Sequence, residues 1–148
     1  MAGAQGRAAY IETIKKIIKD GVCPFCQKYF LKYHTRPILR RGTHWLVTEN
    51  ANPYRGARHH YLFVCTKHVE SPGRLTPRSF GELQSHIRWL QKKYKLPGGT
   101  FFMRFGDTRY TGASVAHLHA QLIVGSRKDS RTEPILVVLA HTKKGSRA

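Results

Sequence analysis

The chain has 148 residues, 41% of them hydrophobic, which is enough for one globular domain with its own core. Its charge is unbalanced, with 26 Lys and Arg residues against 8 Asp and Glu residues, a net charge of +18. No apolar run reaches the length of a membrane span, and the N-terminus lacks the apolar region of a signal peptide. We therefore expect a cytoplasmic protein that does not enter a membrane.

The positive charge predicts anionic ligands. A field of this sign attracts polyanions and raises the association rate of phosphate-bearing molecules. Lys and Arg are scattered along the whole chain, so a general solvated surface is an alternative interpretation. The charge thus supports nucleotide binding weakly and keeps nucleic acid, RNA in particular, open as a partner.

The N-terminal region predicts one short helix. Residues 1–7 are rich in Gly and Ala and are expected to form a disordered tail. From Tyr10 to Asp20 the apolar side chains follow helical spacing, and Gly21 is well placed to end the helix. These apolar positions, expected to pack in the core, are Ile11, Ile14, Ile17 and Ile18.

A Cys-x-x-Cys turn, Cys23-Pro24-Phe25-Cys26, follows this helix. Such a turn presents two thiolates to one ion, and Zn²⁺ takes four nitrogen or sulfur ligands. A redox pair is the alternative, but no βαβ pattern surrounds the turn. The turn by itself favours zinc modestly, because two more ligands must come from elsewhere.

The middle of the chain predicts several strands and one main helix. The helix spans residues 76–94, with Thr76 at the N-cap and Pro77 in the first turn. Its apolar positions run from Phe80 to Tyr94 at three- and four-residue spacing, so it should pack on a sheet. We expect His86 on the helix surface and Trp89 at the core edge. The predicted strands are residues 36–40, 43–48, 60–65 and 100–105.

The most informative stretch is Val115 to Val124, whose polar and apolar residues alternate strictly from His117 to Leu122. A period of two predicts a strand with His117, His119 and Gln121 on one face, about 7 Å from one to the next. The small-residue turn before it, residues 112–114, could bring backbone amides close to an anion. A lone His would favour a half-exposed strand, whereas two His and a Gln behind such a turn favour a functional site.

The pattern Gly112-x-Ser114-Val115-x-His117-x-His119-x-Gln121 resembles the signature of the histidine-triad superfamily. Gln in the third place resembles the galactose-1-phosphate uridylyltransferase and dinucleoside-polyphosphate phosphorylase branches. The resemblance covers roughly residues 22–126. It implies an α+β domain with an antiparallel sheet of about five strands. It also implies that His119 attacks a nucleotide α-phosphate, with Ser114 and Gln121 stabilising the phosphoryl oxygens and Gly112 in the phosphate loop.

A second signature of the superfamily is similar to the stretch from Asn50 to His68. On that match Asn50 contacts ribose and His60 supports the catalytic histidine, while Thr66 replaces the usual Pro. In the uridylyltransferase branch a metal takes the Cys-x-x-Cys pair, the His that ends this strand and the first His of the motif. The resemblance therefore implies a closed, structural Zn²⁺ site with the ligands Cys23, Cys26, His68 and His117.

One position departs from the pattern of many histidine-triad proteins, in which an Asn near Gly106 contacts phosphate. Arg104 stands there, either as a stronger phosphate ligand or as a surface cation. Because Gln121 cannot act as an acid, we expect nucleotidyl transfer or phosphorolysis of nucleotide sugars or dinucleoside polyphosphates rather than hydrolysis of phosphoramidates. Hydrolysis of a nucleotide at the α-phosphate stays open as a third reaction. The alternative is a basic module that binds nucleotides or RNA without turnover.

The C-terminal part predicts one more strand, Ile135 to Leu139, and a disordered basic tail over residues 143–148. No internal repeat or second domain is evident, so residues 1–148 are expected to form a single domain. Many histidine-triad proteins form dimers, which leaves a homodimer open here.

Overall fold

The protein is described by a computed structural model that covers residues 3–145, with side chains from residue 8 onward. Its core is one five-stranded antiparallel sheet with the strand order β1-β2-β3-β5-β4. The elements in chain order are α1 (Gly3–Asp20), α2 (Gln27–Tyr33), β1 (Ile38–Arg41), β2 (Trp45–Glu49), β3 (His59–Cys65), α3 (Pro77–Tyr94), β4 (Thr100–Arg104) and β5 (His119–Val124), with short 3-10 helices at Pro72–Arg74 and Thr108–Tyr110. The predicted α+β class and sheet are confirmed.

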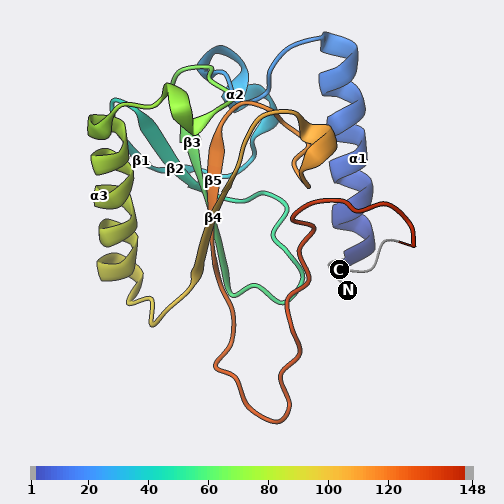
Figure 1. The fold of residues 1–148 in the computed structure, drawn as a ribbon, viewed down its shortest axis with the longest axis vertical. Helices are drawn as coiled ribbons and strands as arrows, with labels where there is room; N and C mark the ends of the chain where they lie inside the picture. The colour runs from blue at the N-terminus through green and yellow to red at the C-terminus, as the bar shows by residue number, and fades with distance from the viewer. Residues whose placement is uncertain (1–2, 146–148) are drawn as a thin grey trace.

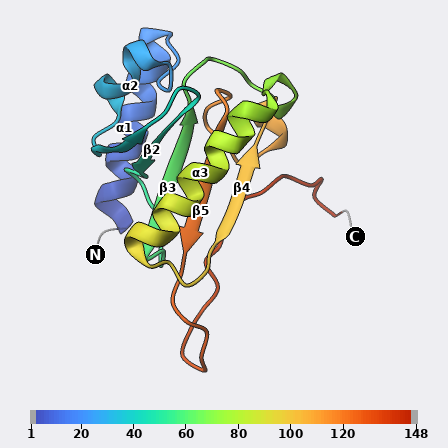
Figure 2. The ribbon, with the colours of Figure 1, turned by 90° about the vertical axis from the view of Figure 1, so that its left-hand side faces the viewer.

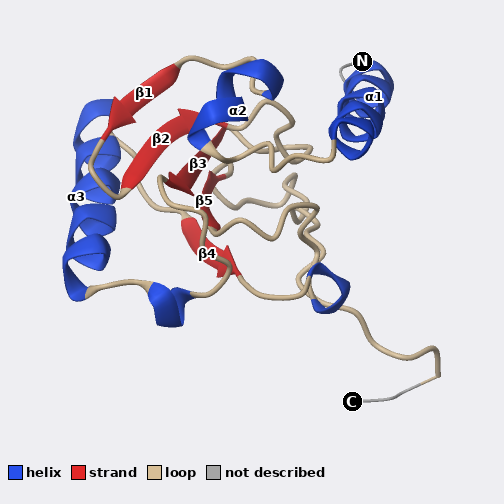
Figure 3. Cartoon of the chain, turned by 90° about the horizontal axis from the view of Figure 1, so that it is seen from above, coloured by secondary structure: helices blue, strands red, loops and turns tan. Residues whose placement is uncertain are grey.

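The sheet separates two packed layers. Helix α3 lies on one face, as Figures 1 and 2 show, and covers the larger apolar cluster, which includes Trp45, Phe63, Leu118 and Ala120. The other face carries a smaller cluster around Phe30 of α2, with Leu46, Leu62 and Val64 beneath it. Seen from above in Figure 3, α1 and α2 lie on the side of the sheet away from α3.

Helix α3 begins as the sequence predicts. Thr76 is the N-cap and forms a capping box with Ser79, and Pro77 occupies the first turn. Its buried positions are Ser79, Leu83, His86 and Leu90, a stripe of three- and four-residue steps. The helix is therefore rotated from the expected orientation: His86 is buried, not on the surface, and Phe80 is exposed.

The N-terminal helix is longer than expected. Helix α1 begins at Gly3, so it includes residues 3–7 of the expected tail, and it ends before Gly21, whose positive φ of 63° closes it. The Ile stripe is only partly buried, since Ile11 is 45% and Ile18 is 73% exposed. Residues 1–2 and 146–148, also expected to be disordered, lie outside the described residues.

The predicted strand from Ile135 to Leu139 is wrong. This segment belongs to no strand, and it lies on the side of the sheet away from α3 instead of pairing with an edge (Figure 1). Strand β5 is also shorter than predicted: it begins at His119, and its six residues are all buried.

Within the described residues, no helix is both long and apolar enough to cross a membrane.

Candidate catalytic and metal site

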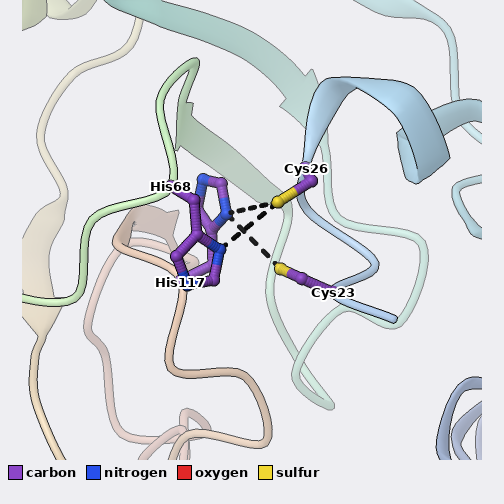
Figure 4. A group of neighbouring side chains, drawn as sticks. All are labelled: Cys23, Cys26, His68 and His117. Carbon is purple, nitrogen blue, oxygen red and sulfur yellow. Dashed lines mark hydrogen bonds between the residues drawn. The ribbon is translucent and has the colours of Figure 1, made fainter. Parts of the chain in front are cut away.

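Four side chains from distant parts of the chain meet at one end of β5. Cys23 and Cys26 lie in the turn between α1 and α2, His68 follows β3, and His117 precedes β5. Their ligand atoms all lie within 4.8 Å of one another, and Figure 4 shows them facing a common centre. We call these four residues the metal cluster; they are the four that the resemblance names.

The spacing inside the metal cluster suits a tetrahedral ion. Cys23 Sγ is 3.4 Å from His117 Nδ1, and Cys26 Sγ is 3.3 Å from His68 Nδ1 and 3.7 Å from His117 Nδ1. Sulfur and nitrogen ligands at the usual zinc distances are about 3.6 Å apart in a tetrahedron. The cluster thus has the dimensions of a bound zinc shell.

The hydrogen-bond partners of His68 and His117 orient each ring so that its Nδ1 faces the cysteine sulfurs. His117 Nε2 donates to the Cys65 carbonyl at 2.7 Å, so its Nδ1 keeps a lone pair for a metal. His68 Nε2 is 3.3 Å from a Glu70 carboxylate oxygen, which orients that ring in the same way. Each imidazole is therefore held by a neighbouring oxygen with Nδ1 facing the two sulfurs.

The protonation states indicate which kind of ion suits the metal cluster. Burial, reinforced by the adjacent Cys23 thiol, raises the pKa of Cys26 to about 11. Burial lowers the pKa of His117 to about 4, so its ring is neutral at physiological pH. Two sulfurs held this close cannot both ionise at low cost unless a cation lies between them. The donor set fits a divalent cation that prefers thiolates, such as Zn²⁺.

His119 lies two residues further along and presents its ring differently. Its Nδ1 donates to the His117 carbonyl at 2.9 Å, which leaves a lone pair on Nε2. The side chain is buried, and the edge of the Phe25 ring packs against it with ring centroids 4.9 Å apart. Burial lowers the pKa of His119, and the positive charge of Arg104 adds to this effect. The ring is thus neutral, with one free nitrogen.

Gln121 is held by a histidine on the neighbouring strand. His60 Nε2 donates to Gln121 Oε1 at 2.7 Å, and the backbone N–H of Tyr54 donates to His60 Nδ1 at 3.2 Å. These two bonds fix the tautomer of His60 and occupy the carbonyl end of the Gln121 amide. The NH₂ end of the amide is then free to donate to an oxyanion. His60 therefore supports Gln121, not His119 directly.

Asn50, the predicted ribose contact, borders the same network. Its Nδ2 is 3.1 Å from His60 Nε2, and its Oδ1 accepts from the backbone N–H of Asn52 at 2.8 Å. The side chain is part of the loop between β2 and β3, close to His60, and a sugar contact for it stays a prediction.

Arg104 is a buried cation beside His119. It pairs with His119 across β4 and β5 and is 8% exposed, so the surface interpretation is wrong. Its Nη2 donates to Tyr54 Oη at 3.1 Å and to the Val138 carbonyl at 2.6 Å, while its Nε is buried without a partner within the described part of the chain. These acceptors are both neutral. A buried charge with neutral partners is costly and favours a site for an anion.

The small-residue turn, residues 112–114, contacts two different segments, the C-terminal segment and α1. Gly112 is pressed against the C-terminal segment, because a Cβ added there would lie 2.1 Å from the Val138 carbonyl oxygen. Ser114 is exposed, and its hydroxyl is hydrogen-bonded to the hydroxyl of Tyr10 in α1. The catalytic role of Ser114 stays a prediction, since this bond turns it toward α1.

Sequence reasoning missed two residues of the site. Tyr54 contacts both Arg104 and His60, and its ring lies 4.7 Å from that of His60. Val138 reaches Arg104 from a segment expected to be a strand. Tyr54 stands in a polar loop, and the Val138 contact uses a backbone carbonyl, so neither position carries a sequence signal.

Comparisons with known proteins agree on the fold. No protein-family model matches the chain, and no curated protein matches it in sequence. Among solved structures, a HIT family hydrolase from Clostridium thermocellum matches with a TM-score of 0.57 and 18% identity, over 77% of this chain and 96% of that one. A histidine triad nucleotide-binding protein from Candida albicans matches with a TM-score of 0.57 and 18% identity, over 76% and 87%.

A third structure is a zinc-bound histidine triad family protein from Mycobacterium smegmatis. It matches with a TM-score of 0.53 and 15% identity, over 74% of this chain and 78% of that one. Identities this low show the fold and leave the activity open. The chain has the fold of the histidine-triad proteins.

Proposed function

We propose that this protein is a nucleotide-processing enzyme of the histidine-triad type that acts at an α-phosphate through a nucleotidyl-histidine on His119. The observation that carries the proposal is the state of this one ring: neutral, buried, anchored through Nδ1 and free at Nε2. A neutral imidazole nitrogen is a nucleophile, and its anchored partner nitrogen can carry the proton that the charged product retains.

The chemistry proceeds in two displacements. In the first, the Nε2 lone pair forms a bond to the α-phosphorus, and the phosphorus–oxygen bond to the leaving group breaks, with its electron pair leaving on that oxygen. In the second, water, phosphate or another oxygen nucleophile attacks the same phosphorus, the nitrogen–phosphorus bond breaks, and the nucleophile loses its proton. Arg104 and the Gln121 amide are the donors that would stabilise the phosphoryl oxygens in both steps.

Gln121 limits which leaving groups are suitable. An amide cannot protonate a departing amine or alcohol, whereas phosphate-type leaving groups depart without a strong acid. We therefore propose nucleotidyl transfer, or phosphorolysis or hydrolysis, of nucleotide sugars or dinucleoside polyphosphates. The C. thermocellum structure is named a hydrolase, which supports this reaction class at the level of the fold.

The metal cluster completes the proposal with a structural role. Cys23, Cys26, His68 and His117 would hold one Zn²⁺, which would cross-link the N-terminal turn, the end of β3 and the start of β5. The same crosslink would fix the His117 carbonyl that anchors His119. With four protein ligands the ion would have no open position for substrate, so it takes no part in the chemistry.

The experiment that tests the proposal is a trap for the covalent intermediate. The protein is incubated with a UDP-sugar, with diadenosine polyphosphates and with a nucleoside phosphoramidate. It is then denatured at alkaline pH, where nitrogen–phosphorus bonds survive, and measured by intact mass. We expect a nucleoside monophosphate adduct with the first two classes, mapped to His119 and absent in His119→Ala. An adduct that persists in His119→Ala would refute the assignment.

A second candidate function is a basic binding module for nucleic acid, favoured by the charge. Eight carboxylates cannot neutralise 26 Lys and Arg side chains, so most of this charge is available to phosphates. Strong, salt-dependent RNA binding without any adduct on His119 would favour this candidate. Homodimerisation, which would extend such a surface, is part of the same proposal and is measured by light scattering.

A further inference from the structure

The C-terminal segment crosses the proposed catalytic site. Residues 134–142, which we call the strap, lie on the side of the sheet away from α3 (Figure 1). Ile135 and Val137 are half-buried, whereas Leu136 between them is 85% exposed. Ile135 packs beside Gly125, and at the end of the strap His141 Nε2 donates to the Thr111 carbonyl at 3.1 Å. The strap is thus seated by a few small contacts.

The backbone of the strap occupies the place suited to an anion. The Val138 carbonyl oxygen accepts a short 2.6 Å hydrogen bond from Arg104 Nη2 and lies against Gly112. The side chain of Val138 points outward and is 54% exposed, so it is the carbonyl, not the side chain, that enters the site. In the sequence analysis, Arg104 is a candidate phosphate ligand and Gly112 belongs to the expected phosphate loop. A phosphoryl oxygen between them would stand where this carbonyl stands.

The energetics favour replacement of the Val138 carbonyl by an anion as the hydrogen-bond partner of Arg104. A carbonyl is a neutral acceptor, and a hydrogen bond from guanidinium to phosphate is roughly twice as strong as one to a neutral oxygen. The buried Arg104 is left incompletely satisfied by the strap, because its Nε has no partner among the described residues. An anion could satisfy both nitrogens, and of the strap's own side chains only Ile135 and Val137 are half-buried, the others being exposed.

We propose that the strap is an autoinhibitory segment whose Val138 carbonyl masks Arg104 until a phosphate group displaces it. This inference rests on the proposed function for the identity of the ligand, a phosphate monoester or diester. It extends that function by making access to the site depend on the C-terminal segment. The strap then sets a threshold: a ligand without an anionic oxygen cannot compete for Arg104.

The test compares two truncations that remove the same Lys and Arg residues. Deleting residues 134–148 removes the strap, whereas deleting 143–148 keeps it, and residues 134–142 contain no Lys, Arg, Asp or Glu. Both truncations therefore lose Lys143, Lys144 and Arg147. Binding of inorganic phosphate and of AMP is measured by calorimetry at one ionic strength. We expect the strapless protein to bind about tenfold more tightly, the scale of one charged hydrogen bond.

Two further variants make the result specific. Ile135→Ser with Val137→Ser in the full chain loosens the strap without shortening it, so it should also tighten binding, and it serves if the truncated chain does not fold. Arg104→Gln introduced into both truncations should abolish the difference between them, because the masked group is gone. Binding by the strapless protein that is equal or weaker would overturn the inference, since the segment would then be inert or part of the binding surface.

The result separates the inference from the proposed function. Tighter phosphate binding without any nucleotide adduct on His119 would support the strap and refute the catalytic proposal. An adduct on His119 with equal phosphate binding by the two truncations would refute the strap alone. If neither truncation binds phosphate or AMP, the strap masks no anion site and the inference fails, whereas the catalytic proposal is still decided by the adduct on His119.

Discussion

The metal cluster and the region around Arg104 lie at the same end of β5, yet they suit ions of opposite charge. In the metal cluster, two cysteine sulfurs and two imidazoles face one another, and the ring of His117 is neutral, so the cluster suits a cation. Around Arg104, a buried cation faces two neutral oxygens, so this region suits an anion. The metal cluster joins side chains from loops far apart in the chain, whereas Arg104 lies on β4, which pairs with β5, and is contacted there by Tyr54 and Val138. Under the proposed function, a cation at the metal cluster would stabilise the fold, and an anionic group of the substrate would bind at Arg104.

The contrast between the two regions is also seen within three residues of sequence, at His117 and His119. His117 uses Nε2 for a backbone carbonyl and turns Nδ1 to the sulfurs, whereas His119 uses Nδ1 for a carbonyl and leaves Nε2 free. One carbonyl also links them, because His119 donates to the backbone of His117. The metal cluster and the nucleophile can thus be separated by mutation, although a disturbed cluster should misplace His119.

The largest expected effect separates these two histidines. His119→Ala should reduce nucleotidyl transfer at least roughly a thousandfold, because the attacking nitrogen is gone, and leave metal content unchanged. His117→Ala should lose the metal, with activity falling as a consequence. The measurements are kcat/KM and metal analysis of both purified variants. A His119→Ala protein that has lost its metal would show that the two regions are not separable.

The next effect concerns stability. Cys23→Ser removes one ligand of the cluster and should lower both zinc content and the free energy of unfolding, the latter by on the order of 4 kcal/mol. Cys65→Ala is the matched control, since Cys65 is buried in the core and contributes only its backbone carbonyl to His117. It should keep its zinc. Wild-type protein that contains no zinc when purified would refute the metal assignment.

Removing the amide donor should be costly but not fatal. Gln121→Ala should raise the activation barrier by roughly 2–4 kcal/mol, the usual cost of one lost oxyanion donor. Gln121→His adds a titratable acid and should shift preference toward hydrolysis and toward poorer leaving groups. The ratio of kcat/KM values for a phosphoramidate and a dinucleoside polyphosphate measures this shift. An unchanged ratio would contradict a role for this residue in leaving-group choice.

A smaller effect tests Tyr54, which contacts both Arg104 and His60. Tyr54→Phe removes one of the two acceptors of Arg104 but keeps the ring on His60 and the backbone bond to His60 Nδ1. We expect an increase in KM worth about 1 kcal/mol, with kcat unchanged, because only the orientation of Arg104 is affected. A fall in kcat with unchanged KM would assign Tyr54 to the chemical step instead.

The smallest effect is on pH dependence. The nucleophile must be neutral, and burial together with Arg104 lowers the pKa of His119 from its usual 6.5. Activity should therefore persist below pH 6.5, with the acid limb of kcat/KM at a pH lower than that of an ordinary histidine. Arg104→Gln removes one cause of the shift, so the limb should move upward. A substrate that does not titrate in this range is required, and an acid limb above 6.5 would contradict a buried neutral nucleophile.

The sequence by itself determined the class of the fold and the chemistry of one strand. Residue periodicity and capping place α3 and the central strands, because these signals are local. Alternation from His117 to Leu122 sets His119 and Gln121 on one face. The four ligands of the metal cluster also follow from the sequence, but only through the resemblance, since no local rule brings Cys23 near His117.

Only the tertiary structure decided which nitrogen of each ring is free and what surrounds Arg104. Those outcomes depend on the carbonyls of Cys65, His117 and Val138, and backbone oxygens leave no trace in the residue pattern. The rotation of α3 that buries His86 also depends on contacts between distant segments. The same is true of the strap, which the sequence predicts to be a strand. An extended apolar segment pairs with a sheet edge or lies across a face according to which long-range contacts form, and those contacts exist only in the folded chain.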